Sequence, residues 1–212
     1  MKMCILSREF FERPTLDVAR DLIGKLLVHE EDGRRLVGRI VETEAYREDD
    51  PACHAWYEIK RRRSKSGAGW RGEVLLGEPG IAYVYLNYGM YWLLNVVTEP
   101  PGVGAAVLIR AVQPLEGIEI MRARRPVKTD RDLTNGPGKL TLAFGIDDRH
   151  HRRPLTEPPL FLAADCPEPD LPIAVSRRIG IVRGAELPWR FYVPGNPWVS
   201  GKKSLNDNKD RQ

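Results

Sequence analysis

The sequence predicts an α+β protein: a single compact domain with a mainly antiparallel curved sheet, a few short helices and a protruding aromatic β-hairpin. Three observations favour this class. Hairpin signals recur along the chain, helical segments are few and short, and strands and helices do not alternate as they do in a doubly wound parallel sheet. At 212 residues, the chain has the length of one domain with a full core.

The first predicted elements are a helix and a hairpin. Residues Thr15–Ile23 have an apolar helical face and a capping residue at their start, and Gly24 ends the helix. A strand is expected at Lys25–Glu30. Asp32-Gly33 is a strong turn signal, so this strand should form a hairpin with a long second strand, Arg34–Tyr46.

An aromatic hairpin is expected from Ile81–Leu86 and Tyr91–Thr98, joined by the turn residues Asn87-Tyr88-Gly89. Its arms and turn contain five aromatic rings and no charge. Because such turns face solvent, a tyrosine is expected at an exposed tip, where it could enter the groove or base stack of a nucleic acid. A membrane helix over the uncharged run Pro79–Thr98 is disfavoured by the polar residues inside it.

The remaining predicted elements are short. The pattern predicts a strand at Ala105–Val112, a helix at Leu115–Arg124, a loop at Thr134–Gly138 that leads into a helix at Lys139–Phe144, a polar surface loop at Asp147–Pro159, and strands at Leu160–Ala164, Ala174–Val182 and Phe191–Val193.

Charge and cysteine content restrict the function classes. The net charge of +4 and the excess of arginine over lysine favour a polyanionic partner, although genome composition can give the same excess. Cys4, Cys53 and Cys166 are isolated in the sequence, and the four histidines lack zinc-ligand spacing. The chain is therefore expected to be intracellular, reduced and free of metal, without a membrane segment.

The end of the long second strand carries the main catalytic candidates. Regular alternation places Leu36, Ile40, Glu42, Glu44 and Tyr46 on one face. A carboxylate at a strand end beside an aromatic ring can stabilise a cationic sugar and deprotonate an attacking water. Alternatively, both glutamates lie on a solvated face in ion pairs with arginines.

Other candidates have two possible roles. Arg110 could partner Glu44 or form a structural ion pair. His54 lies in a loop, where a packing role is the commoner one, and Asn95 could satisfy backbone groups or read the edge of a ligand.

Two segments are candidates for phosphate contacts. The basic run Lys60–Lys65, which includes Arg61 and Arg62, could neutralise phosphates, form a solvated loop or act as a local targeting-like patch. The segment Asn135–Lys139 could present backbone N–H groups at a helix start. It lacks the spacing of a nucleotide-binding loop, so no nucleotide cofactor is expected.

In their order and spacing, several segments resemble the alkyladenine-type 3-methyladenine DNA glycosylases. The matching segments are Ala19–Val28, Ile40–Tyr46, Tyr83–Tyr91, Leu108–Ala111, Asn135–Leu140, and Arg190–Val193 with Gly195–Ser200.

The resemblance implies a monofunctional enzyme of base excision repair in residues 1–200, with a flexible tail at 201–212. It would flip damaged purines (3-methyladenine, 7-methylguanine, hypoxanthine and ethenoadenine) from duplex DNA and hydrolyse the N-glycosidic bond, leaving an abasic site without lyase activity. It would work as a monomer without a cofactor. The alternative is a non-catalytic protein that binds damaged DNA structure, and a third class is a hydrolase of RNA or free nucleosides.

The resemblance also assigns residues. Glu44 matches the general base, and Arg110 and the carbonyl of Ile179 match the groups that hold the attacking water. The base pocket corresponds to Tyr46, His54, Tyr85 and Asn95, of which Asn95 disfavours the guanine 2-amino group. Tyr88 matches the ring that fills the gap left by the flipped base, and the further DNA contacts would be Met90, Gly136, Lys139, Arg61 and Arg62.

One segment departs from the family. After His54 the family has a short loop with a Gly-Arg-Thr-Pro-Arg-Asn core, whereas Trp56–Arg71 is different and unusually basic here. His54 also lies one residue nearer to Tyr46 than the family pattern predicts. This departure affects two properties that the resemblance implies: the contacts with the DNA strand and the preference among damaged bases.

Overall fold

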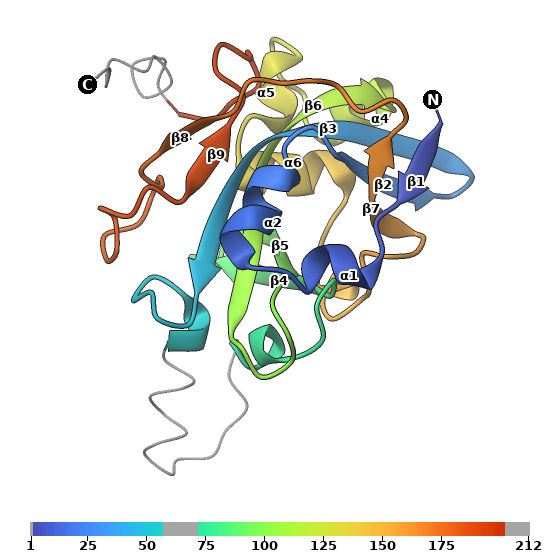
Figure 1. Cartoon of the computed structure of the whole chain (residues 1–212). Coiled ribbons are helices and arrows are strands. Elements are labelled where there is room, and N and C mark those ends of the chain that lie inside the picture. Colours follow the sequence, from blue (N-terminus) through green and yellow to red (C-terminus); the bar gives the residue numbers. More distant parts are fainter. Residues whose placement is uncertain (1, 57–71, 202–212) are drawn as a thin grey trace.

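A nine-stranded antiparallel sheet organises the protein in the computed structural model (Figure 1). The structure describes residues 2–56 and 72–201. The strand order is β1-β7-β2-β3-β6-β5-β4, and β9 pairs with both β3 and β8. The predicted α+β class with a mainly antiparallel sheet is therefore confirmed.

The elements have the following bounds. The strands are β1 (Met3–Ile5), β2 (Leu26–Glu31), β3 (Arg34–Arg47), β4 (Ala82–Asn87), β5 (Tyr91–Val97), β6 (Ala105–Glu116), β7 (Leu160–Asp165), β8 (Ala174–Ser176) and β9 (Arg190–Tyr192). The helices are α1 (Arg8–Phe11), α2 (Thr15–Asp21), α4 (Ile118–Arg124), α5 (Arg131–Thr134) and α6 (Pro137–Phe144), with 3-10 turns η1 (Glu73–Leu76) and η2 (Asp148–His150).

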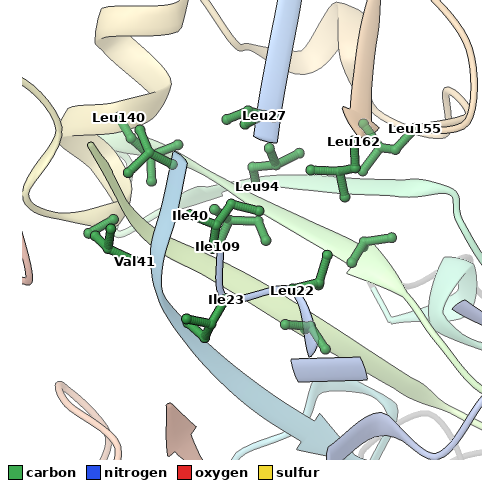
Figure 2. Close-up of a cluster of buried hydrophobic side chains, with 14 of the residues drawn as sticks. Leu22, Ile23, Leu27, Ile40, Val41, Leu94, Ile109, Leu140, Leu155 and Leu162 are labelled. Atoms are coloured by element: carbon green, nitrogen blue, oxygen red, sulfur yellow. The ribbon is translucent and has the colours of Figure 1, made fainter. Parts of the chain in front are cut away.

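The main core lies between the helices and one face of the sheet. It receives Leu22 after α2 and Leu140 from α6, which pack with Ile40, Leu94 and Ile109 of the central strands (Figure 2). A second, smaller cluster lies on the side of the sheet that carries Tyr46. The helices thus cover one face of the sheet, and the ends of β3 to β6 on the other face are not part of this main core.

An irregularity in β3 corrects the predicted alternation. Ile40 and Val41 are consecutive, yet both lie in the main core (Figure 2), and the register with β6 shifts at this point. A regular strand cannot bury two successive side chains on one face, whereas a β-bulge can. Beyond it Ala45 faces the core, while Glu42 and Glu44 turn to the opposite face. The prediction that Ile40 and Glu44 share a face is wrong, because the bulge reverses the alternation.

Several predicted boundaries were also wrong. The start of α2 is satisfied by the Glu99 carboxylate, which accepts hydrogen bonds from the backbone N–H and the hydroxyl of Thr15, so Thr15 does not cap the helix. β6 continues to Glu116, where the predicted helix had already begun, because residues 115–116 still lie along β3. Gly117, with φ of 77°, ends the strand and precedes α4.

The predicted surface loop Asp147–Pro159 is partly buried. Leu155 lies in the main core, and His150 in η2 contacts His29. Sequence polarity did not reveal these contacts, because they are made by single side chains within a charged segment.

The β4–β5 pair packs against the start of α6. A Cβ atom on Gly138 would come within 2.7 Å of Tyr91, and the hydroxyl of Thr141 donates to the Trp92 carbonyl over 2.7 Å. α6 begins at Pro137, two residues before the predicted start, because proline suits the first helical turn, where an N–H has no acceptor. This packing places the Gly136–Lys139 segment beside the aromatic strands.

No helix in residues 2–56 and 72–201 has the length and apolar content required to cross a membrane.

Candidate active site

A cavity of about 520 Å³ lies at the ends of β3, β4, β5 and β6. Such a volume falls in the range of small-molecule pockets. Predicted site residues in its wall are Tyr46, His54, Tyr85, Tyr88, Asn95, Arg110 and Ile179. The structure thus brings together residues from five separate parts of the chain.

Glu44 lies behind this wall. Its side chain has no exposed surface. Its Oε1 accepts a hydrogen bond from the backbone N–H of Ile179 over 2.7 Å, and its Oε2 accepts one from the Tyr46 hydroxyl over 2.8 Å. Burial and the neighbouring Glu44 raise the pKa of Tyr46 well above its ordinary value, so Tyr46 stays protonated and serves as a donor.

Arg110 connects Glu44 to the cavity. Its Nη1 donates to Glu44 Oε2 over 3.2 Å and to the carbonyl oxygen of Ile179 over 3.4 Å. Burial opposes the charge of Arg110, but Glu44 and Glu42 outweigh burial and raise its pKa above the ordinary value. Arg110 is therefore a permanent cation at the wall of the cavity.

Glu42 orients Arg110 from the other side. Its Oε1 accepts hydrogen bonds from Arg110 Nε over 3.0 Å and from Arg190 Nε over 2.7 Å. The backbone and hydroxyl of Ser200 complete its shell. Burial raises the pKa of Glu42, but Arg110 and Arg190 outweigh it, and the net pKa lies below the ordinary value. Glu42 is thus an ionised carboxylate whose two oxygens are paired with arginines and Ser200, which gives it a structural role behind the cavity.

A second buried ion pair supports the ring of Tyr46. Arg178 pairs with Asp50, and neither side chain has exposed surface. The Arg178 guanidinium carbon lies 4.6 Å from the centroid of the Tyr46 ring, within cation–π range. Arg178 Nη1 also donates to the Ala45 carbonyl over 2.9 Å. This pair fixes the position of one wall of the cavity.

The opposite wall is aromatic. The rings of Tyr83 and Tyr85 stack with centroids 5.1 Å apart, and His54 meets Tyr85 edge-on at 4.8 Å. The Tyr83 hydroxyl lies 2.6 Å from His54 Nδ1. Tyr83 is not among the predicted site residues, but it lines the cavity and holds His54 in place.

Asn95 is held by the β4–β5 pair. Its Nδ2 donates to the Tyr83 carbonyl over 3.1 Å, and the side chain also lines the cavity. Asn95 therefore satisfies a backbone group, as one of the two alternatives predicted, and it also borders the pocket, while contact with the edge of a ligand stays a prediction.

The candidate DNA contacts differ in exposure. Tyr88 is 85% exposed and Met90 is 65% exposed at the turn between β4 and β5. Gly136 is buried, and Lys139 Nζ donates to the side chain of Asn135 over 2.7 Å. Arg61 and Arg62, like residues 202–212 of the predicted tail, lie outside the described residues.

Among the charged and hydroxyl residues that support the site, sequence reasoning missed Asp50, Arg178, Arg190 and Ser200. Arg190 had a signal, because an arginine in an apolar strand needs a buried counter-ion. Arg178 and Asp50 had none, since their partners are far away in the sequence. Within residues 2–56 and 72–201, no group of three His, Cys, Asp or Glu side chains is arranged to hold a metal ion.

Fold and site together define a class of protein: an α+β enzyme whose pocket is lined by aromatic rings and adjoins a buried Glu–Arg pair. The chain belongs to the Methylpurine-DNA glycosylase (MPG) family, because the model of that family matches residues 9–197. Membership implies a hydrolase that acts on N-glycosyl bonds and binds DNA.

Similar proteins carry the name "Putative 3-methyladenine DNA glycosylase". One from Salinibacter ruber is 56% identical over 92% of this chain and 96% of its own length. One from Carboxydothermus hydrogenoformans is 45% identical over 93% of this chain and 100% of its own length. A third, from Chlorobaculum tepidum, is 44% identical over 92% of this chain and 90% of its own length.

Proposed function

We propose that this chain flips damaged purines from duplex DNA and hydrolyses their N-glycosidic bond with a water activated by Glu44, leaving an abasic site. The substrate class comprises 3-methyladenine, 7-methylguanine, hypoxanthine and ethenoadenine. The observation that carries the proposal is the position of Arg110, whose Nη1 contacts both Glu44 and the Ile179 carbonyl at the wall of the cavity.

The proposed chemistry is general-base catalysis. Glu44 takes a proton from water as the water attacks the sugar C1′ atom, and the carboxylate also stabilises the positive charge that develops on the sugar. Arg110 and the Ile179 carbonyl hold the water. Tyr46, Arg110 and Ile179 orient the Glu44 carboxylate, and Oε1 accepts only the Ile179 N–H among these contacts, so it has an acceptor site for the water.

The proposed pocket accepts the flipped base between two walls. Tyr46 forms one side, with His54 and Tyr85 on the other. Aromatic faces stack on any purine, so this pocket suits several lesions. Asn95 is proposed to disfavour the 2-amino group of guanine. Methylated purines such as 3-methyladenine leave readily because they carry positive charge, whereas neutral hypoxanthine needs help at its ring nitrogens.

Tyr88 is proposed to fill the gap in the stack. Unstacking a nucleotide costs a few kcal/mol, and an inserted ring offsets part of that cost. Its exposure on a turn supports this role, and Met90 lies beside it. Gly136 and Lys139, at the start of α6, and the basic segment with Arg61 and Arg62 are proposed to contact phosphates.

The proposed reaction needs no lysine nucleophile. None of the described residues that line the cavity is a lysine. The proposal therefore includes the absence of lyase activity, and water rather than a cofactor supplies the second substrate. We further propose that the protein acts on DNA as a monomer and inside the cell.

The test is a panel of duplex, single-stranded and free-nucleoside substrates that carry the four lesions, with released base and abasic sites measured. Base release from lesion-bearing duplex supports the proposal. Tight binding of lesion-bearing duplex without base release would instead support the non-catalytic binder, although the pairing of Glu44 with Arg110 disfavours it. Release from nucleosides alone would also contradict the proposal, since an exposed Tyr88 serves no purpose there.

A further inference from the structure

Two cysteines that are far apart in the sequence lie together in the fold. The Sγ atoms of Cys4 and Cys166 are 3.4 Å apart, although 162 positions separate them. Cys4 belongs to β1, and Cys166 directly follows β7. The sequence had presented all three cysteines as isolated, because spacing along a chain does not reveal pairs made across a sheet.

Strand pairing holds the two cysteines near each other. β1 and β7 are antiparallel, with Cys4 opposite Ala164. The backbone N–H of Cys166 donates to the Lys2 carbonyl over 2.9 Å, which continues the same ladder by one residue. Cys4 and Cys166 are therefore diagonal neighbours on one face of the pair, where side chains reach each other.

The pair is also accessible. Cys4 is exposed and Cys166 is half-buried. The hydrogen bond with Cys4, followed by burial, raises the pKa of Cys166, which favours its thiol form. Cys53 differs in accessibility, since it is buried, and its burial raises its pKa to about 12. The chain therefore contains an accessible cysteine pair and a buried cysteine that serves as an internal control.

We propose that Cys4 and Cys166 form a reversible disulfide when the protein meets a hydroperoxide or a disulfide oxidant. The bond requires the two sulfurs to close to about 2.05 Å. β1 spans only Met3–Ile5, and in the described sheet it pairs with β7 alone, so this edge strand can shift by the small distance needed.

The reaction with a hydroperoxide balances as follows. The Cys4 thiolate attacks the terminal peroxide oxygen, the O–O bond breaks, and the alcohol or water leaves with a proton. The sulfenic acid on Cys4 is then attacked by the Cys166 sulfur, which forms the S–S bond and expels hydroxide, and the Cys166 proton converts it to water. The two thiols lose two electrons and the peroxide gains them.

The disulfide would act on stability rather than on the cavity. It ties β1 to β7 and closes a long loop, which restricts the unfolded chain. Neither cysteine lines the cavity, so base release is expected to be the same in both redox forms. The inference is independent of the proposed function.

The experiment uses the full chain, reduced and then treated with hydrogen peroxide or oxidised glutathione. The wild type and Cys53→Ser should become lighter by two hydrogen atoms, give a Cys4–Cys166 linked peptide, and melt about 5–10 °C higher. A thiol reductant should reverse all three changes. Cys4→Ser and Cys166→Ser should show none of them, although both should fold, because Cys4 is exposed and Cys166 is half-buried.

Three results would overturn the inference. The first is a glutathione adduct or a sulfinic acid on Cys4 in place of the linked peptide. The second is a covalent dimer through Cys4 as the main product. The third is a linked peptide without any rise in melting temperature, which would show that the bond forms but does not stabilise the fold.

Discussion

The guanidinium of Arg110 donates to Glu44 through Nη1 over 3.2 Å, and both side chains are removed from solvent. The same guanidinium donates to Glu42 through Nε over 3.0 Å. Because a guanidinium is planar and rigid, the bond to Glu42 fixes the direction in which Nη1 points. The position of Glu44 relative to the cavity thus depends on Glu42, although Glu42 does not itself line the cavity.

Replacing Glu42 should therefore weaken the fold. Glu42→Ala leaves Arg110 and Arg190 buried without their shared counter-ion, and we expect the free energy of unfolding to fall by about 3–5 kcal/mol. Denaturant unfolding measures this. Ser200→Ala removes a hydroxyl that donates to Glu42 and accepts from Arg110, but it leaves all three charges in place, so it should cost less, about 1.5–3 kcal/mol. Equal stability of Glu42→Ala and wild type would show that the network does not support the site.

Tyr88→Ala should weaken binding to damaged DNA. Loss of a stacking ring costs about 1–3 kcal/mol, so affinity for a duplex with a stable abasic-site analogue should fall about tenfold. Fluorescence anisotropy measures the affinity, and Tyr88→Phe should retain it. Leu142→Ala provides the control, since it removes another exposed apolar side chain from α6. An unchanged affinity for Tyr88→Ala would argue against insertion into the stack.

Stability should fall as the pH decreases below about 6.5, the ordinary pKa of histidine. Burial and the neighbouring His29 lower the pKa of His150 in the folded state. A lowered pKa means that the unfolded chain binds the proton more readily, so this stability is present above the ordinary pKa and is lost as the pH falls through the folded pKa.

His150→Asn tests this dependence, since asparagine does not titrate and keeps an acceptor for the N–H of Asp147. The slope of unfolding free energy against pH between about 5.5 and 7 should become flatter in this variant. Asp148→Asn, an exposed neighbour, should leave the slope unchanged. A wild-type slope in His150→Asn would contradict the assignment to His150.

The absence of lyase activity can be tested by chemical trapping. Reduction with borohydride during turnover should yield no covalent protein–DNA adduct, because the mechanism uses water and forms no imine. Denaturing gels of labelled duplex detect any adduct. A trapped adduct would identify an amine nucleophile and contradict the monofunctional mechanism.

The sequence predicted the sheet because its signals are local. Asp32-Gly33 and the uncharged aromatic arms each indicate a hairpin within a few residues, and β2–β3 and β4–β5 are paired as expected. The bulge at Val41 was not predictable in this way. It depends on the register with β6, and without it the alternation of β3 assigns Glu44 to the core face.

The site was predictable only in part. Resemblance to a family indicated the residues around the cavity, several of which the fold brings together. The residues around the cavity are held in place by ion pairs between residues far apart in the sequence, such as Arg178 with Asp50 and Arg190 with Glu42. No local pattern in the sequence specifies such pairs, because each depends on how β9 and the segment between β8 and β9 pack against β3 and the residues that follow it.

Base release by Glu44→Gln is the most direct test of the central claim. We expect release of hypoxanthine from duplex DNA to fall by at least about 100-fold, because the amide cannot accept the proton of water. Binding of the same duplex should stay within a few fold, and Glu119→Gln, an exposed carboxylate on α4, should behave as wild type. Release at the wild-type rate by Glu44→Gln would contradict the assignment of Glu44 as the general base.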